Sequence, residues 1–204
     1  MESFPSNINV RSVNQMEENS ERLPFLMTIA MGKDGRPDID VERATASYER
    51  VKNIRSRIIE EALFVEASVT GVILAFVLGD KRYREARLLR ALIFDSEFCT
   101  FMQKRKILSK IFDICGDDIQ CLTKDEAKFL RRNLNEIILE RDKFAHGQLL
   151  IDGFTYKPWI IYYRDGENKD EIEEGIEEKF IDKCKQVEVK LDKLRDFFKR
   201  HNLG

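Results

Sequence analysis

The chain has 204 residues, of which 43% are hydrophobic and 35% are charged, so it can bury a substantial core and is not disordered overall. Its formal net charge of −2 excludes a uniformly basic surface, and a polyanion must therefore be met by a local patch. Glycine (10) and proline (4) are few, which favours helices over a turn-rich β architecture. We expect a mainly α protein.

The first half of the chain predicts a leader followed by three helices. Residues 1–37 form a leader to which the pattern assigns no structure or role, and a helix follows over about 38–78, ending at Gly79-Asp80. A second helix is expected over about 82–94 and a third over about 101–115. The second helix is expected to turn four apolar side chains inward, namely Leu88, Leu89, Leu92 and Ile93.

The strongest helical pattern covers residues 123–146. Thr123 is the expected N-cap, backed by Glu126 three positions later, and Gly147 stands at the expected C′ position. An approximate apolar stripe runs along the segment, made of Leu130, Leu134, Ile137, Ile138 and Phe144. We therefore expect a helix of about six turns that ends at His146.

The periodicity changes after His146. β-branched and aromatic residues between turn dipeptides predict a β-hairpin at about 148–165, and the acidic run 166–178 is expected to be a solvated loop and helix start. A final helix is expected over about 175–201, with an apolar stripe of Phe180, Val187, Leu191, Leu194 and Phe198. The expected fold over residues 38–204 is an antiparallel helical bundle with a small β-hairpin inserted before the C-terminal helix.

Cofactor, metal and membrane signals are weak in this sequence. The four cysteines (99, 115, 121 and 184) show no Cys-x-x-Cys spacing, and nucleotide-binding and zinc-protease motifs are missing, so we expect reduced thiols, no cofactor and no metal. The N-terminus lacks an apolar segment typical of a signal peptide. The most apolar stretch, residues 62–78, contains Glu66 and is interpreted as a buried helix rather than a membrane span. We expect a cytoplasmic protein with no membrane association.

One hexapeptide, running from Arg141 to His146, carries the strongest chemical signal. The carbonyl end of a helix carries partial negative charge and favours an imidazolium, which suits a histidine that both gives and takes a proton. Arg141 presents a planar cationic fork that matches phosphate oxygens. On a straight helix, however, residues five positions apart point roughly 140° apart and lie about 7.5 Å apart along the axis. Either the last turn distorts, or a second copy of the chain completes the site.

The string Arg141, polar Asp142, three further residues and His146, followed by Gly147, resembles the Arg-polar-x-x-x-His signature of HEPN domains (higher eukaryotes and prokaryotes nucleotide-binding). The resemblance covers about residues 40–200, although only the hexapeptide is specific. It implies a helical bundle acting as a metal-independent endoribonuclease, with Arg141 and His146 as catalytic residues, Asp142 in support and RNA as substrate. It also implies a homodimer and, for part of the family, a separate protein antitoxin or regulator.

Other residues are candidates for supporting roles. Glu66, alone among apolar neighbours, would need a cationic partner if buried, and Arg141 is one candidate; otherwise it lies on an exposed edge of its helix. Basic side chains that could follow an RNA backbone are Lys104, Arg105, Lys106, Lys110, Arg131, Arg132 and Lys143, each of which is also compatible with ordinary helix surface.

Two further interpretations remain open. In the first, His146 simply caps its helix and Arg141 pairs with a neighbouring carboxylate such as Glu140 or Glu136. In the second, the chain is a non-catalytic helical module that binds RNA or a protein partner, with the aromatic side chains of the hairpin as the docking surface. Those side chains are Phe154, Tyr156, Trp159, Tyr162 and Tyr163.

Overall fold

The computed structural model of the chain describes residues 26–27, 40–79, 82–96 and 99–201. Apart from residues 26–27, the leader expected over 1–37 lies outside this range. The chain divides into two compact units, which are described separately. The sheet unit comprises residues up to Arg55 together with His146–Glu173, and the bundle unit comprises Ser56–Ala145 and Glu174–Gly204.

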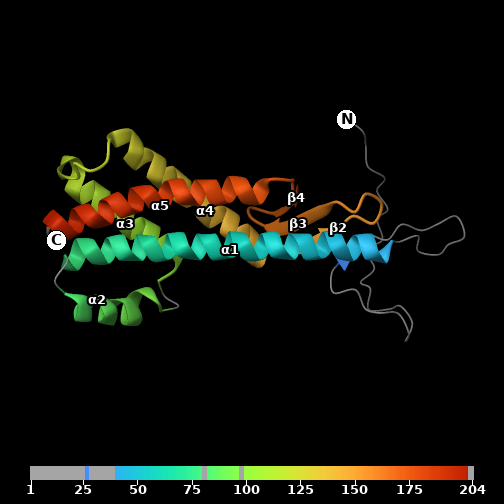
Figure 1. The fold of residues 1–204 in the computed structure, drawn as a ribbon, viewed down its shortest axis with the longest axis horizontal. Coiled ribbons are helices and arrows are strands. Elements are labelled where there is room, and N and C mark those ends of the chain that lie inside the picture. The colour runs from blue at the N-terminus through green and yellow to red at the C-terminus, as the bar shows by residue number, and fades with distance from the viewer. Residues whose placement is uncertain (1–25, 28–39, 80–81, 97–98, 202–204) are drawn as a thin grey trace, which may run out of the picture. The chain divides into compact units, whose positions relative to one another are not determined.

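Helices account for most of the described chain, which confirms the expected mainly α class (Figure 1). Their order is α1 (Val41–Leu78), α2 (Tyr83–Leu89) with a π-helical continuation (Arg90–Phe94), α3 (Phe101–Cys115) with a short 3-10 turn (Gly116–Asp118), α4 (Lys124–His146) and α5 (Ile176–His201). The helices expected from sequence start and end within about three residues of these bounds. Three strands of a small sheet lie between α4 and α5 in the chain, where the hairpin was expected.

The core of the bundle unit is formed by the apolar stripes that the sequence predicts. All five stripe residues of α4 and all five of α5 are at most 5% exposed. Helix α4 runs antiparallel to α5, because Glu126 pairs with Lys190 and Glu136 with Lys183. Helices α1 and α5 run in the same direction, because Phe76 meets Phe198 edge to face with ring centroids 5.2 Å apart, and Gly71 lies against Arg195.

Helix α4 begins with the predicted capping box. The Thr123 hydroxyl accepts a hydrogen bond from the Glu126 N–H at 3.1 Å, and the Glu126 carboxylate accepts one from the Thr123 N–H at 3.0 Å. This backbone hydrogen bond, together with the Lys190 ammonium, lowers the pKa of Glu126 from 4.5 to about 2. The ionised form of Glu126 therefore helps to start the helix.

The end of α4 differs from the expectation in one respect. The helix does end at His146, but Gly147 is not among the residues with positive φ and does not form a left-handed C′ cap. Strand β2 instead begins directly at Gln148, and the Gly147 carbonyl accepts a hydrogen bond from Arg55 at 3.4 Å. The chain thus passes from helix to extended strand without a reversing turn.

The sheet of the sheet unit has four strands in the order β1-β2-β3-β4: β1 (Leu26–Met27), β2 (Gln148–Ile151), β3 (Pro158–Tyr163) and β4 (Glu167–Glu171). Strands β2, β3 and β4 are antiparallel, while β1 pairs in parallel with β2. The hairpin expected at about 148–165 corresponds to β2 and β3 (Figure 1). Treating the acidic run 166–178 wholly as a solvated loop and helix start was wrong, because its first part forms β4.

The loop between β2 and β3 is anchored to the start of α1. Tyr156 adopts a left-handed backbone conformation (φ 59°), which is unfavourable for a residue with a bulky side chain. Its hydroxyl accepts a hydrogen bond from the Asp40 N–H, and its carbonyl accepts one from the Ser47 hydroxyl, both at 2.9 Å. The ring packs with Ala44 and Ile151, which form the buried cluster of this unit.

The inward orientation predicted for the second helix was wrong for three of its four apolar residues, since only Leu89 is half-buried. Leu88, Leu92 and Ile93 are 57%, 67% and 48% exposed, whereas Phe94 is the buried apolar residue at 7%. The four-residue periodicity correctly indicated a helix with an apolar side, but no described element of the chain covers that side. The sequence pattern alone does not reveal this.

Helix α1 is long and apolar enough to cross a membrane by length and composition, and 39% of its most apolar window is buried. The core helix of a soluble protein meets the same criteria, so the expected cytoplasmic location stays a prediction. The helix is only partly the buried element expected from sequence, because Leu63, Phe64 and Val77 are about half exposed.

The capping box predicts a pH-dependent contribution of Glu126 to stability. Because its pKa is lowered on folding, its carboxylate stabilises the folded chain fully above about pH 4.5, and this stabilisation is lost as the pH falls toward 2. We expect Glu126→Gln to lower the urea midpoint at pH 7, and this loss to shrink steadily between pH 5 and pH 3. Asp125→Asn, on the exposed neighbour, is the control. A midpoint difference for Glu126→Gln that is independent of pH would contradict this assignment.

Candidate functional site

His146 is the last residue of α4 and is exposed. Within the described part of the chain, its imidazole makes no hydrogen bond or ion pair. Both ring nitrogens are therefore available to an incoming ligand. An exposed imidazole at this position can reach a bound substrate and exchange a proton with it.

Arg141 lies five positions earlier on α4, and its side chain is 28% exposed. Its Nη1 lies 2.8 Å from the Asp142 carboxylate, and its Nε is buried with no hydrogen-bond partner in the described chain. The guanidinium has five N–H donors, so the single pairing with Asp142 leaves donors for another anion. Asp142 is about half exposed, and such a pair contributes little to stability.

The carboxylates expected to compete for Arg141 are engaged elsewhere. Glu140 pairs with Lys143 at 2.8 Å, and Glu136 pairs with Lys183 at 2.6 Å. Of the carboxylates near it in sequence, Asp142 is therefore the one that pairs with Arg141. Arg141 thus does pair with a neighbouring carboxylate, as the non-catalytic interpretation expects, but the partner is Asp142 and not Glu136 or Glu140.

Helix α4 keeps its α-helical form through His146. The distortion of the last turn that would bring Arg141 and His146 toward one point does not occur. By the geometry of a regular helix, the two side chains leave α4 about 140° apart and about 7.5 Å apart along its axis. The backbone of α4 therefore directs the two side chains away from each other.

The partner of Glu66 is Lys104, not Arg141. The Lys104 Nζ donates to the Glu66 carboxylate at 2.7 Å, and the two side chains are 7% and 15% exposed. The Glu66–Lys104 ion pair thus links α1 to α3 in the interior of the bundle unit. Lys104 is correspondingly removed from the residues that could contact RNA, because its charge is buried and neutralised.

The remaining basic candidates differ in how free they are. Arg131 pairs with Asp113 at 2.8 Å, and Lys143, paired with Glu140, is only 12% exposed. Arg105 is half-buried, and its Nε has no partner in the described chain. Arg132 is 70% exposed and 3.8 Å from Glu136. Among the described residues, the exposed candidates outside any ion pair are Lys106 and Lys110.

The buried cysteines are poor candidate nucleophiles. All four are free, and two of them, Cys115 and Cys184, are buried. Burial raises the pKa of Cys184 to about 12, so almost none of it is thiolate at neutral pH. In the described part of the chain, no three His, Cys, Asp or Glu side chains are grouped closely enough to hold a metal ion.

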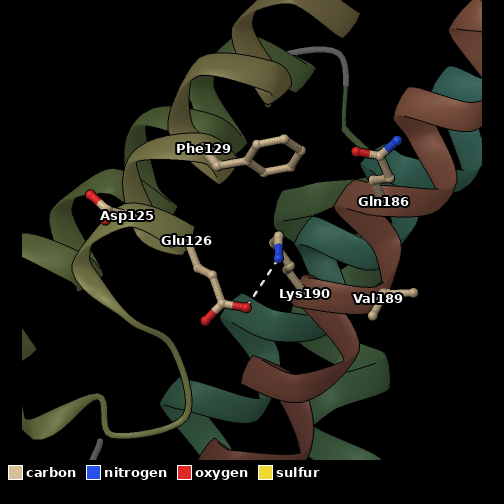
Figure 2. Close-up of a pocket in the computed structure, with 6 residues that line it drawn as sticks. All are labelled: Asp125, Glu126, Phe129, Gln186, Val189 and Lys190. Atoms are coloured by element: carbon tan, nitrogen blue, oxygen red, sulfur yellow. Dashed lines mark hydrogen bonds and ion pairs between the residues drawn. The ribbon is translucent and has the colours of Figure 1, made fainter.

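Sequence reasoning missed a shallow groove of about 430 Å³ where α4 and α5 face each other in the bundle unit. Figure 2 shows Lys190 reaching from α5 toward Glu126, beside the ring of Phe129. The ammonium of Lys190 lies 5.3 Å from the centre of that ring. The capping box pointed to Glu126 as a structural residue, but no local signal indicated that α5 would place a cation and apolar carbon against it.

Comparison of the chain with protein-family models, with curated protein sequences and with solved structures gave no match. The functional assignment therefore depends on the residues of the hexapeptide and on the geometry of α4.

The buried Glu66–Lys104 pair generates a stability prediction. Lys104→Met leaves the Glu66 carboxylate without its cation in the interior, which costs about 3 kcal/mol of unfolding free energy. We expect the double variant Glu66→Leu, Lys104→Met to recover most of this loss, since it removes both charges. Urea denaturation followed by circular dichroism measures both.

The control is Lys52→Met, which removes the cation of an exposed pair with Glu49 and should cost well under 1 kcal/mol. Equal losses for Lys52→Met and Lys104→Met would show that the interior pair has no special role.

Proposed function

We propose that the protein is a metal-independent endoribonuclease of the HEPN type, in which His146 and Arg141 act on one phosphodiester of RNA. The observation that carries the proposal is the exposed imidazole at the end of α4, which has no hydrogen-bond partner among the described residues. On the same helix it is preceded by an arginine with donors to spare. Both residues stand at the positions that the Arg-polar-x-x-x-His pattern assigns to catalysis.

The chemistry needs a base, an acid and a cation. One imidazole takes the proton of the ribose 2′-OH, and the 2′ oxygen attacks the adjacent phosphorus. The bond from phosphorus to the 5′ oxygen breaks, and an imidazolium donates a proton to that leaving oxygen. The products are a 2′,3′-cyclic phosphate and a 5′-hydroxyl. A guanidinium beside the non-bridging oxygens stabilises the charge that develops during attack.

The proposed site is shared by two copies of the chain. A regular α4 directs Arg141 and His146 apart, so a two-fold dimer that brings two α4 ends together supplies one imidazole as base and the other as acid. The two Arg141 side chains then face the same phosphate. Lys106 and Lys110, exposed and outside any described ion pair, are the proposed contacts to the RNA backbone.

A second candidate function, a non-catalytic module that captures a protein or RNA, is favoured by the exposed aromatic side chains of the sheet unit. Phe154 and Tyr163 are 72% and 80% exposed, which is unusual for large aromatic residues. Trp159 is a weaker docking residue, because it is half-buried and the Lys169 ammonium lies 4.5 Å from the centre of its ring. An antitoxin or other regulator is a proposed occupant of this surface.

The nuclease assignment predicts that His146→Ala slows cleavage of single-stranded RNA by at least about a hundredfold, because acid-base catalysis is lost. Cleavage by the wild type should persist in a chelator and should spare an all-deoxy strand of the same sequence, which lacks the attacking hydroxyl. His201→Ala, at the exposed end of α5, is the matched control. Equal cleavage by wild type and His146→Ala would refute the assignment.

If RNA binds without being cleaved, the module interpretation is supported instead. Capture of RNA or of a co-purifying protein should then be lost in a Phe154→Ser, Tyr163→Ser double variant and kept in His146→Ala.

A second kinetic prediction concerns Arg141. Arg141→Lys keeps the positive charge but loses the planar fork, so the rate of cleavage should fall roughly tenfold or more while RNA affinity changes little. Rates under single-turnover conditions and affinities from filter binding separate the two effects. Arg132→Lys, on the same helix and 70% exposed, should leave the rate unchanged. A rate for Arg141→Lys equal to that of wild type would exclude bidentate phosphate contact.

A further inference from the structure

The helical segment Arg82–Phe94, here called the α2 segment, exposes an unusual amount of apolar surface. It comprises α2 and its π-helical continuation within the bundle unit. Leu88 and Leu92 are four positions apart and therefore lie on the same side of the helix. Their side chains are 57% and 67% exposed. Removing these apolar side chains from water would be favourable, but no described element of the chain covers them.

The same segment is strongly basic. It contains four arginines against a single glutamate, Glu85. Among the described residues, none of the four guanidinium groups takes part in an ion pair or hydrogen bond. The arginines are Arg82, Arg84, Arg87 and Arg90. Four uncompensated cations on one short helix favour an anionic partner.

The basic and apolar residues are adjacent in space. Arg84 lies four positions before Leu88 and therefore on the same line of the helix surface, and Arg87 occupies the turn beside it. Long arginine side chains can keep their charged ends in a polar layer while the neighbouring leucines enter an apolar one. The segment thus presents a cationic border around an apolar strip.

These features discriminate between classes of partner. An RNA strand would satisfy the arginines but leave Leu88 and Leu92 in water. The interface of an anionic bilayer offers phosphate groups and acyl carbon within a few ångström of each other, which matches both halves of the segment. We propose that the α2 segment binds the surface of anionic lipid bilayers, lying in the interface without crossing the membrane. This site is independent of the proposed nuclease chemistry.

The test is sedimentation of the full-length chain with lipid vesicles. The protein should bind vesicles of phosphatidylcholine containing about 30% phosphatidylserine and should be released by salt, while pure phosphatidylcholine vesicles should bind it about tenfold less. Two double variants should each reduce binding about tenfold. One carries Arg84→Glu together with Arg87→Glu, and the other carries Leu88→Ser together with Leu92→Ser. All four positions are exposed, so both variants should keep the helical circular dichroism of the wild type.

The control for the arginine variant is the double variant that carries Lys106→Glu together with Lys110→Glu. The control for the leucine variant is Ile114→Ser, because Ile114 is an apolar residue on α3 that is 75% exposed. These controls and His146→Ala should bind vesicles as the wild type does. The proposal is overturned if the wild type does not bind the anionic vesicles, or if only the arginine variant loses binding, which indicates simple charge adsorption. It is equally overturned if the arginine variant loses RNA binding while its vesicle binding is unchanged.

Discussion

The regular α-helical geometry of α4 is the constraint on which the functional account depends. The helix starts at a capping box, buries a continuous apolar stripe and remains α-helical to its last residue. Because each residue advances the helix by about 100°, the positions of Arg141 and His146 in the sequence already determine the angle between them. In the proposed site, the two residues that meet on one phosphate therefore come from two chains. The proposed chemistry therefore depends on formation of a dimer.

The immediate surroundings of the two residues are consistent with that chemistry. Arg141 is partly buried and oriented by Asp142, so part of the cost of ordering its long side chain is met before substrate arrives. The carboxylate of Asp142 also reduces the local positive charge, and an RNA phosphate must compete with it. The competing carboxylates of Glu136 and Glu140 are removed by their own lysine partners. These two pairs, one within α4 and one between α4 and α5, thus limit how strongly Arg141 is neutralised.

The sequence was informative wherever structure follows from neighbours along the chain. The cap at Thr123, the stripe of α4 and the end of α4 at His146 depend on residues within one helix and were correctly predicted. Strand β4 was missed because Glu167–Glu171 has no apolar alternation, and it forms only through pairing with β3 across a tight turn at Asp165 and Gly166. The partner of Glu66 was missed for a related reason, since Lys104 is 38 positions away and meets it only through packing. The exposure of Leu88 and Leu92 was missed because periodicity predicts an apolar side but not whether anything covers it.

The most direct measurement for the shared site is RNA cleavage by the wild type after subunit exchange with an excess of His146→Ala. A mixed dimer contains two guanidinium groups but a single imidazole, so it lacks either the base or the acid. The account predicts that cleavage of single-stranded RNA per wild-type chain falls as the share of His146→Ala rises, because fewer wild-type chains remain paired with each other. A rate per wild-type chain that is independent of added His146→Ala, or a wild-type protein that is monomeric under conditions in which it cleaves, would contradict the account.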